Sequence, residues 1–410
     1  MRKGELEARL LILVTLALVA FGLVMVYSAT SAAAAVGGSD PSYYLKRQGA
    51  YAVLGIVLMI VAQRWDYRRL RPLAPGLVLV ALAALAAVLV VGPAVNGARR
   101  WISFGPAVFQ PSEFAKLALC VWAAAWLSKR KPPRTLYELW RPVGALAVVF
   151  SVLLILEPDM GTAIALLVML AGMLLVTGTP ARLLSIALTL SLAAGTAAIW
   201  FEPYRRARFF AFLHPTQDAQ GTGYQMAQAM IGMGSGGWFG RGLGQGLAKI
   251  FYLPEAHTDM MLANIGEELG LVGVAAVIGA YALFAYAGLR VALNARDPFG
   301  KRLASGLTVL VCGQAVINIG AVMGVAPLTG IPLPFLSYGG SSLIVLLASV
   351  GILLNIASRG TAATASVSDR GRRDGRARTA GARSRGSADG AGRAGDLRRV
   401  AGSRRGAARS

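Results

Sequence analysis

The chain has 410 residues, of which 56% are hydrophobic and only 15% are charged, and its mean hydropathy is +0.58. Soluble domains carry about 25% charged residues, and here the apolar residues fall in long blocks, so the composition excludes a soluble globular protein and indicates membrane spans. The net charge of +22 does not indicate nucleic acid as a partner, because the basic residues lie in a C-terminal tail and in short loops between apolar blocks.

In chain order, ten apolar blocks predict an all-α integral membrane protein with about ten transmembrane helices, which together form one polytopic domain over residues 1–358. The second, fourth and fifth blocks are short and are expected to extend into their flanks. The eighth is overlong and is expected to tilt or to project beyond the bilayer. The blocks are 10–27, 49–62, 73–91, 114–127, 143–156, 161–176, 183–200, 260–289, 303–322 and 341–357.

The charges of alternate loops predict the orientation. The N-terminus and the loops 64–71, 129–141, 178–182 and 290–302 carry 17 Lys and Arg residues, whereas the opposite short loops carry 4. Positive residues favour the cytoplasmic side, so both termini are expected to be cytoplasmic. The first block could instead be a cleaved signal, but its length favours a retained anchor.

The last segment, residues 359–410, contains 14 Arg, 4 Asp and no aromatic residue. Such a composition cannot bury a core, which predicts a disordered basic cytoplasmic tail. A basic segment next to a membrane span could also hold anionic lipid headgroups.

Ionisable residues near the hydrocarbon are costly and therefore informative. In this sequence most of them lie near the outer ends of the predicted spans. That one-sided distribution favours chemistry on a headgroup at the outer surface over a proton path through the bilayer. The residues are Glu113, Lys116, Glu157, Asp159, Glu255, His257, Asp259, Glu267 and Glu268.

Two of these pairs have simpler interpretations. Glu113 and Lys116 stand at positions i and i+3 after Pro111, so they could form only a local ion pair; however, Lys116 lies inside a span, where a charge usually has a use. Glu157 and Asp159 flank Pro158 in a tight hairpin turn, and the alternative is a pair of acids that binds a cation.

One long extracytoplasmic loop, residues 202–259, is expected between the seventh and eighth spans. Residues 232–237 match G-x-G-x-x-G, but no strand precedes them, so a dinucleotide site is not indicated. Ten glycines between Gly221 and Gly246 predict a backbone that packs closely on the membrane surface or on a ligand. The amphipathic run 224–233 could lie in the interface.

Asp259 stands where this loop enters the eighth span. A carboxylate with apolar residues behind it suits general-base work, although it could equally cap the helix. His257 alone indicates a hydrogen-bonded structural residue, and His214 is the only other histidine, which argues against a zinc site. The sequence has no Ser-His-Asp set, cysteine nucleophile or phosphate-binding Walker loop.

Several of these residues fall in motifs that resemble the SEDS family (shape, elongation, division and sporulation proteins). The resemblance runs in order over residues 10–358. The motif sequences resemble those of the division-type members more than those of the elongation-type members, although residues 329–335 resemble the elongation type. The motifs are Asn96-Gly-Ala-Arg-Arg-Trp101, Gln110-Pro-Ser-Glu-Phe-Ala-Lys116, Glu157-Pro-Asp159, Leu253-Pro-Glu-Ala-His-Thr-Asp259, Ile265-Gly-Glu-Glu-Leu-Gly270 and Leu333-Pro-Phe-Leu-Ser-Tyr-Gly-Gly-Ser-Ser342.

The resemblance implies a peptidoglycan glycosyltransferase of the bacterial cytoplasmic membrane that polymerises lipid II. Its implied partners are a class B penicillin-binding protein and other divisome or elongasome membrane proteins. The family's essential aspartate falls on Asp259, and its substrate- or pyrophosphate-binding residues fall on Arg100, Glu113 and Lys116. Supporting roles fall on Glu157, Asp159, His257, Glu268, Ser337 and Tyr338. A divalent cation such as Mg²⁺ or Mn²⁺ is a candidate cofactor, its ligands are unknown, and no organic cofactor is expected.

Two other functions remain open from the sequence. A lipid II flippase would need polar residues at several depths across the membrane, whereas here they gather near one face. A non-catalytic scaffold for a transpeptidase would not require Asp259 together with Glu113 and Lys116. For the glycosyltransferase, one base suffices because pyrophosphate leaves without a strong acid, and direct displacement predicts inversion at the anomeric carbon.

Overall fold

The structure is a computed structural model, and it describes residues 4–36, 40–94, 97–105, 107–213, 223–246 and 257–359. Statements about the structure refer to these residues. The tail 360–410 and residues 247–256, which include part of the Leu253–Asp259 motif, lie outside the described residues. The predicted all-α membrane fold is confirmed, since long apolar helices make up most of the described chain.

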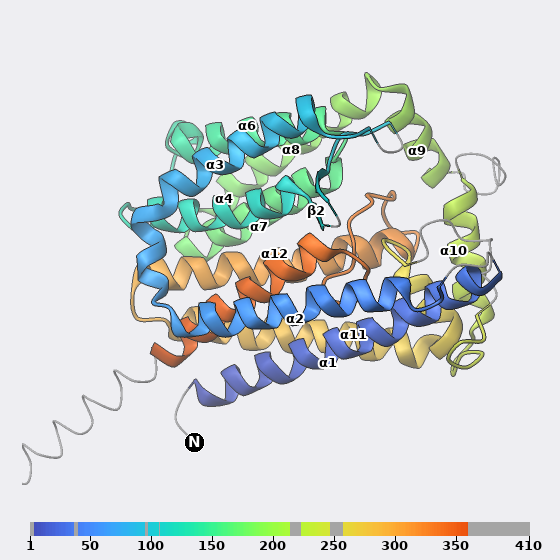
Figure 1. The fold of residues 1–410 in the computed structure, drawn as a ribbon. Coiled ribbons are helices and arrows are strands. Elements are labelled where there is room, and N and C mark those ends of the chain that lie inside the picture. The colour runs from blue at the N-terminus through green and yellow to red at the C-terminus, as the bar shows by residue number, and fades with distance from the viewer. Residues whose placement is uncertain are drawn as a thin grey trace, which may run out of the picture. The chain divides into compact units, whose positions relative to one another are not determined.

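The first half of the chain contains six of the longer helices and one hairpin (Figure 1). Two three-residue strands, β1 (Ile102–Phe104) and β2 (Ala107–Phe109), pair antiparallel with Ile102 opposite Phe109. The other elements are α1 (Glu5–Val36), α2 (Tyr43–Arg64), η1 (Tyr67–Arg69), α3 (Leu70–Val91), α4 (Pro111–Leu127), α5 (Leu136–Leu139), η2 (Trp140–Gly144), α6 (Ala145–Leu156) and α7 (Met160–Thr177).

The second half adds two shorter helices within the predicted long loop. One of them, α10, coincides with the amphipathic run predicted at 224–233. The elements are α8 (Ala181–Trp200), α9 (Pro203–Leu213), α10 (Tyr224–Ser235), α11 (Met261–Asn294), α12 (Pro298–Val322) and a last helix, Gly340–Arg359.

Within the described residues, nine helical segments are long and apolar enough to cross a membrane. The one predicted span that is not among these nine is the fourth, 114–127. It corresponds to α4, which has only 17 residues and carries two charges in its first two turns. As expected, the short blocks extend into their flanks: the second span covers Tyr43–Arg64 and the fifth covers Leu136–Leu156.

Small residues allow the central helices to approach closely. Gly306 of α12 faces Cys120 of α4 and Met173 of α7, and a Cβ atom at Gly306 would lie only 2.6 Å from the Cys120 sulfur. Such small-residue contacts are typical of helix packing in membranes. By contrast, α8 is largely exposed, with Leu188, Leu190 and Leu192 on its surface, which suits contact with lipid.

The overlong eighth span corresponds to α11, whose tilt or projection in a membrane stays a prediction. Its helix α11 is interrupted at Gly270, whose φ of 65° and ψ of −162° are not helical. The glycine-rich segment packs against this break: Leu271 N–H donates to the Gly237 carbonyl and Arg241 N–H donates to the Glu267 carbonyl. The glycines therefore serve a close approach between two parts of the backbone, which requires Gly at Gly240 and Gly270.

Four segments that were predicted to lie in the cytoplasm meet at one end of the helices. Arg359, at the end of the last helix, pairs with Asp66 at 2.8 Å, and Glu7 of α1 lies 3.7 Å from Arg290. In Figure 1 this end lies opposite to β2 and α10. The gathering of these segments agrees with the predicted topology, whose orientation in the membrane stays a prediction.

Candidate functional site

The first turn of α4 carries a buried ion pair. Pro111 occupies the first helical turn, where its missing N–H costs nothing, and Glu113 follows near the positive end of the helix dipole. Lys116 Nζ lies 2.8 Å from Glu113 Oε1, and the two side chains are 1% and 2% exposed. The predicted pairing is confirmed, and it places both charges inside the helix bundle rather than at a solvated surface.

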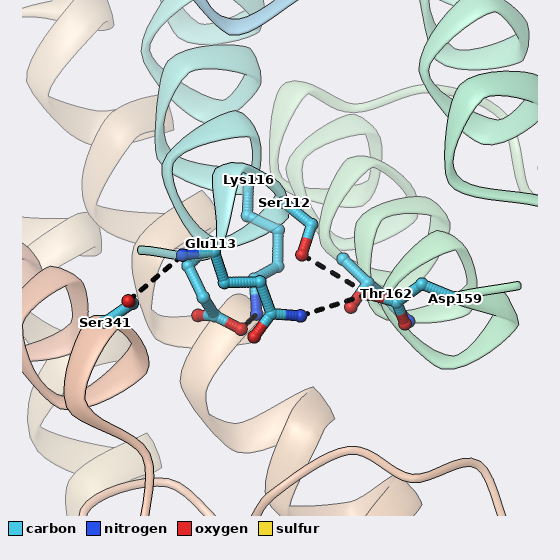
Figure 2. A network of polar contacts seen from close by, with 7 residues as sticks. Ser112, Glu113, Lys116, Asp159, Thr162 and Ser341 are labelled. Atoms are coloured by element: carbon cyan, nitrogen blue, oxygen red, sulfur yellow. Dashed lines mark hydrogen bonds and ion pairs between the residues drawn. The ribbon is translucent and has the colours of Figure 1, made fainter. Parts of the chain in front are cut away.

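Asp159 connects α4 to the start of α7 (Figure 2). One of its oxygens accepts the Thr162 N–H at 3.1 Å and caps α7. The other accepts from Ser112 Oγ at 3.3 Å and from Gln110 Nε2 at 3.4 Å. The acidic turn, residues 157–159, is thus a hairpin connection, as one interpretation expected, but its aspartate also holds α4 and α7 together.

Glu157, on the same turn, is fully buried. Among the described residues neither of its carboxylate oxygens has a hydrogen-bond partner. Burial and the neighbouring Asp159 raise the pKa of Glu157 from 4.5 to about 8, although Arg100 opposes the shift. A buried carboxyl without a partner is costly, so this residue is a candidate for work that the folded chain alone does not explain.

Arg100 fixes the backbone of this turn. Its Nε donates to the Glu157 carbonyl at 3.0 Å, and a terminal nitrogen donates to the Pro158 carbonyl. The guanidinium is only partly buried and still has N–H donors beyond these two bonds. It can therefore hold the turn and present positive charge to a ligand at the same time.

Asp259 is partly buried and lies just before α11. Asn318 of α12 holds its backbone: Asn318 Nδ2 donates to the carbonyls of Asp259 and Ile331, each at 2.8 Å. The N-cap position of α11 is occupied by Met260, one residue after Asp259. Asp259 Oδ1 also accepts from Thr258 Oγ1 at 3.3 Å.

His257, two residues before Asp259, contacts the segment that contains Ser337 and Tyr338. The rings of Tyr44 and His257 lie 4.8 Å apart, and Tyr338 N–H donates to the His257 carbonyl at 2.8 Å. Ser337 Oγ accepts the Leu333 N–H at 2.9 Å. Burial raises the pKa of Tyr338 to about 12, so this phenol stays neutral.

A chain of contacts brings these parts to one end of the bundle. Gly161, at the start of α7, packs on the Thr329 carbonyl and on Ile331, whose own carbonyl binds Asn318 beside Asp259. Ser341 Oγ accepts the Gln110 N–H at 3.1 Å. Consequently Asp259, the first turn of α4 and the acidic turn share the end opposite to the paired charges of Asp66 and Arg359.

Glu268 binds α1 and the glycine-rich segment. Its carboxylate accepts from Ser28 Oγ of α1 at 2.7 Å and from the Gly244 N–H at 3.0 Å. These contacts hold the glycine-rich segment against α1 and α11. The structure therefore connects Glu268 to that segment.

The search for ionisable residues overlooked four buried or partly buried amides. Gln110 and Asn318 bind the two aspartate-bearing segments, and Gln48 binds the backbone of Ser337 and Gly339. Gln314, on α12, is 1% exposed. Amides of this kind can be identified in a sequence as carboxamides within or next to apolar spans, because a polar group there also needs a partner.

The described residues contain no group of three or more His, Cys, Asp or Glu side chains arranged to hold a metal ion. Mg²⁺ commonly binds through only one or two carboxylates together with substrate phosphates. A shared protein–substrate site is therefore the form in which a divalent ion would fit these residues.

Residues 8–361 match the family of cell cycle proteins that comprises FtsW, RodA and SpoVE. The chain is 43% identical over 352 residues to the probable peptidoglycan glycosyltransferase FtsW of Geobacter metallireducens, covering 85% of this chain and 94% of the relative. It is 41% identical to the protein of the same name from Halomonas elongata, over 84% of this chain and 89% of that one.

Two solved structures are similar over most of the chain. A chain from a peptidoglycan synthase complex that coordinates polymerization and crosslinking matches with a TM-score of 0.72 and 32% identity, over 85% of this chain and 97% of that one. The rod shape determining protein RodA of Thermus thermophilus matches with a TM-score of 0.62 and 32% identity, over 85% and 95%.

Proposed function

Because the chain belongs to the FtsW, RodA and SpoVE family of cell cycle proteins, we propose that it is a peptidoglycan glycosyltransferase that polymerises lipid II. It works as a multi-pass protein of the bacterial cytoplasmic membrane. The relatives named FtsW favour a role in division over one in elongation. Polymerisation takes place at the outer face, where the predicted topology puts Asp259.

The observation that carries this proposal is the position of Asp259. Its backbone is fixed by Asn318, while its side chain is only partly buried at the end of the bundle that gathers Arg100, Glu113 and Lys116. In the proposed reaction Asp259 removes the proton from an acceptor sugar hydroxyl as that oxygen attacks the anomeric carbon of the donor. The bond from that carbon to the lipid pyrophosphate breaks, and the pyrophosphate leaves with the electron pair.

Positive charge assists the departure of the pyrophosphate. Lys116 is held 2.8 Å from Glu113 and Arg100 is held by the acidic turn, so both cations are fixed before substrate binds. Fixed charges need little reorganisation as negative charge develops. Direct displacement of the pyrophosphate inverts the anomeric carbon, by analogy with inverting glycosidases.

A divalent cation is the further component of this proposal. It would bind together with the substrate pyrophosphate and would neutralise charge on the leaving group. Removal of divalent ions with EDTA should lower the rate, and added Mg²⁺ or Mn²⁺ should restore it. An unchanged rate in EDTA would leave Arg100 and Lys116 as the charges that act on the pyrophosphate.

The proposed partner is a class B penicillin-binding protein, a transpeptidase that crosslinks the strands. A similar chain is part of a peptidoglycan synthase complex, which supports a partner of this kind. Other division or elongation membrane proteins would join the same assembly.

Incubation of the purified protein with lipid II, with and without its transpeptidase, separates the candidate functions. Glycan polymer is the expected product. Translocation of lipid II across vesicles without polymer would indicate a flippase, and neither activity would indicate a scaffold. The gathering of buried charges at one end favours the enzyme, because a flippase needs a polar path through the whole bilayer.

A further inference from the structure

Four buried side chains at the candidate site carry polar atoms that have no hydrogen-bond partner within the described part of the chain. Two belong to the acids Glu113 and Glu157, and two belong to the amides Gln314 and Asn318 of α12. The unpaired atoms are Glu113 Oε2, Glu157 Oε1 and Oε2, Gln314 Oε1 and Nε2, and Asn318 Oδ1. Three other unpaired atoms in the described residues, Thr15 Oγ1, Ser151 Oγ and Arg302 Nε, lie singly on α1, on α6 and in the N-terminal part of α12. Most buried polar side chains in folded proteins are hydrogen-bonded, so the larger group, in these four side chains, indicates groups kept for a ligand.

Gln314 and Glu157 are the members of this set that the proposed mechanism does not use, and Gln314 is the one that cannot ionise. Residues spaced by four positions form one ridge on a helix, and Gly306, Leu310, Gln314 and Asn318 have this spacing on α12. The Gly306 end of the ridge packs on Cys120 of α4, and the Asn318 end binds the Asp259 carbonyl. Gln314 therefore lies one turn, or about 6 Å along the helix axis, from the residue that holds Asp259.

The chemistry of the unpaired atoms identifies the class of ligand. Five of the six atoms are oxygens, and the sixth is the Gln314 amide nitrogen. An ionised phosphate offers only acceptors, so it is a poor match for these oxygens, of which only the protonated carboxyl of Glu157 carries a donor. A sugar that carries hydroxyl groups and a secondary amide offers donors to these oxygens.

Gln314 lacks a partner for both its donor and its acceptor. A carboxamide can pair reciprocally with a secondary amide, donating to its carbonyl and accepting from its N–H. We infer that Gln314 binds the N-acetyl group of a lipid II sugar and thereby positions that sugar below Asp259. This inference rests on the proposed function, since lipid II is the source of the N-acetyl sugar.

The inference predicts opposite effects on stability and activity for Gln314→Met, which keeps the side-chain length and removes both polar atoms. Stability should stay equal or rise, because an unpaired buried amide is replaced by an apolar group. The kcat/KM for lipid II should fall about tenfold or more, as is usual when a hydrogen bond to substrate is lost.

Asn355→Leu is the matched control. Asn355 is a buried amide in the last helix whose bonds are satisfied: Oδ1 accepts the Tyr67 N–H at 3.1 Å and Nδ2 donates to the Gln63 carbonyl. Its replacement leaves two backbone groups without partners and should lower the melting temperature. If Gln314→Met lowers the melting temperature in the same way, Gln314 has a structural role and the inference is wrong.

A second substrate identifies the group that Gln314 binds. The wild-type protein and Gln314→Met are assayed with lipid II and with an analogue in which the N-acetyl groups are replaced by hydroxyls. The wild type should prefer lipid II by about tenfold or more, and the variant should have lost most of that preference. The ratio of the two kcat/KM values is independent of how much of each preparation is active.

The outcomes are distinguishable. Equal preference for lipid II in the variant and the wild type would overturn the inference while leaving the proposed function intact. No polymer from the wild type, even with its transpeptidase, would overturn the proposed function itself, and the inference would fall with it.

Discussion

Buried carboxyl and amide groups are paired differently at the two ends of the helix bundle, although Arg302 Nε, near the end predicted to be cytoplasmic, also lacks a partner among the described residues. At the end predicted to be cytoplasmic, the buried amide of Asn355 is satisfied by the Tyr67 N–H and the Gln63 carbonyl, and Arg359 pairs with Asp66 at 2.8 Å. At the other end, Gln314 and Glu157 are just as buried but have unpaired atoms among the described residues. The first arrangement is what stability alone requires, and the second indicates a ligand.

The ion pairs at the two ends also differ in how much desolvation they require. Lys116 and Glu113 form an ion pair that is almost completely buried, and such a pair is a weak source of stability because desolvation opposes it. The pair of Arg359 with Asp66 is partly exposed and needs little desolvation. Glu7, at the end predicted to be cytoplasmic, is also buried, but its partner Arg290 is exposed. The pair Lys116–Glu113, in which both charges are buried, lies at the end where the proposed chemistry uses it.

The largest expected effect is that of Asp259→Asn, which removes the proposed base at the polar end with little change of shape. Polymerisation should fall by about 10²–10⁴, while the melting temperature and membrane insertion stay as in the wild type. The assay is lipid II polymerisation by matched amounts of purified protein. A rate within a few-fold of wild type would remove Asp259 from the role of base.

Lys116→Met tests whether the buried ion pair serves catalysis. We expect a rate loss of about 10² at every pH, without a shift of the acidic limb of the pH profile, because the pyrophosphate rather than the base loses a partner. The variant should also be less stable, since Glu113 is left buried and unpaired.

Adding Glu113→Gln to Lys116→Met should restore stability but not the rate. If the rate returns as well, the ion pair is structural. A shifted acidic limb with normal turnover would instead mean that Lys116 acts by tuning a neighbouring acid.

Glu157 makes the stability of the polar end depend on pH. Its pKa is raised from 4.5 to about 8 in the folded state, mainly by burial. The folded state therefore keeps a proton that the unfolded state loses, and stability falls as the pH rises from about 4.5 to about 8. The melting temperature of the wild type should drop by roughly 5–10 °C over this window.

Glu157→Gln cannot ionise and is the control for that measurement. Its melting temperature should change much less between pH 5 and pH 8 than that of the wild type. Equal pH dependence in the two proteins would assign the effect to another group.

The smallest effect is expected from deletion of residues 364–410. This segment has no aromatic residue with which to pack on the helices, and the predicted topology puts it across the membrane from Asp259. Polymerisation in detergent should stay within about twofold of the full-length rate, while activity in anionic liposomes could fall through lost lipid attraction. A large loss in detergent would show that the tail acts on the catalytic part or on its partner.

The spans were predictable because burial of about 20 apolar residues dominates their energetics, and hydropathy averages over that whole length. The helix α4 was predicted from its hydropathy, and the turn at Glu157 was predicted because only four residues separate two apolar blocks. The break of α11 at Gly270 was not, since it depends on contacts with Gly237 and Trp238 from a distant segment. The hydropathy of residues 260–289 carries no trace of those contacts.

The site was predictable as a set of charges but not as a network. Asp159 and Glu157 were identified together, yet only the structure separates them: the oxygens of Asp159 bind Ser112, Gln110 and Thr162, and those of Glu157 remain unpaired. Gln314 was missed because attention to ionisable residues ignores amides. Long-range pairing decides which of these groups is free for a ligand, and a sequence alone does not give that pairing.

Covalent mapping of the substrate position tests most directly the claim that the end with unpaired polar atoms is the functional end. A lipid II analogue with a photoreactive group on its sugar is bound to the purified protein, irradiated, and the modified peptides are identified by mass spectrometry. Adducts should concentrate in residues 100–116, 157–162 and 257–264. Adducts at residues 64–71 and 290–302, or spread evenly over the lipid-facing helices, would contradict the account.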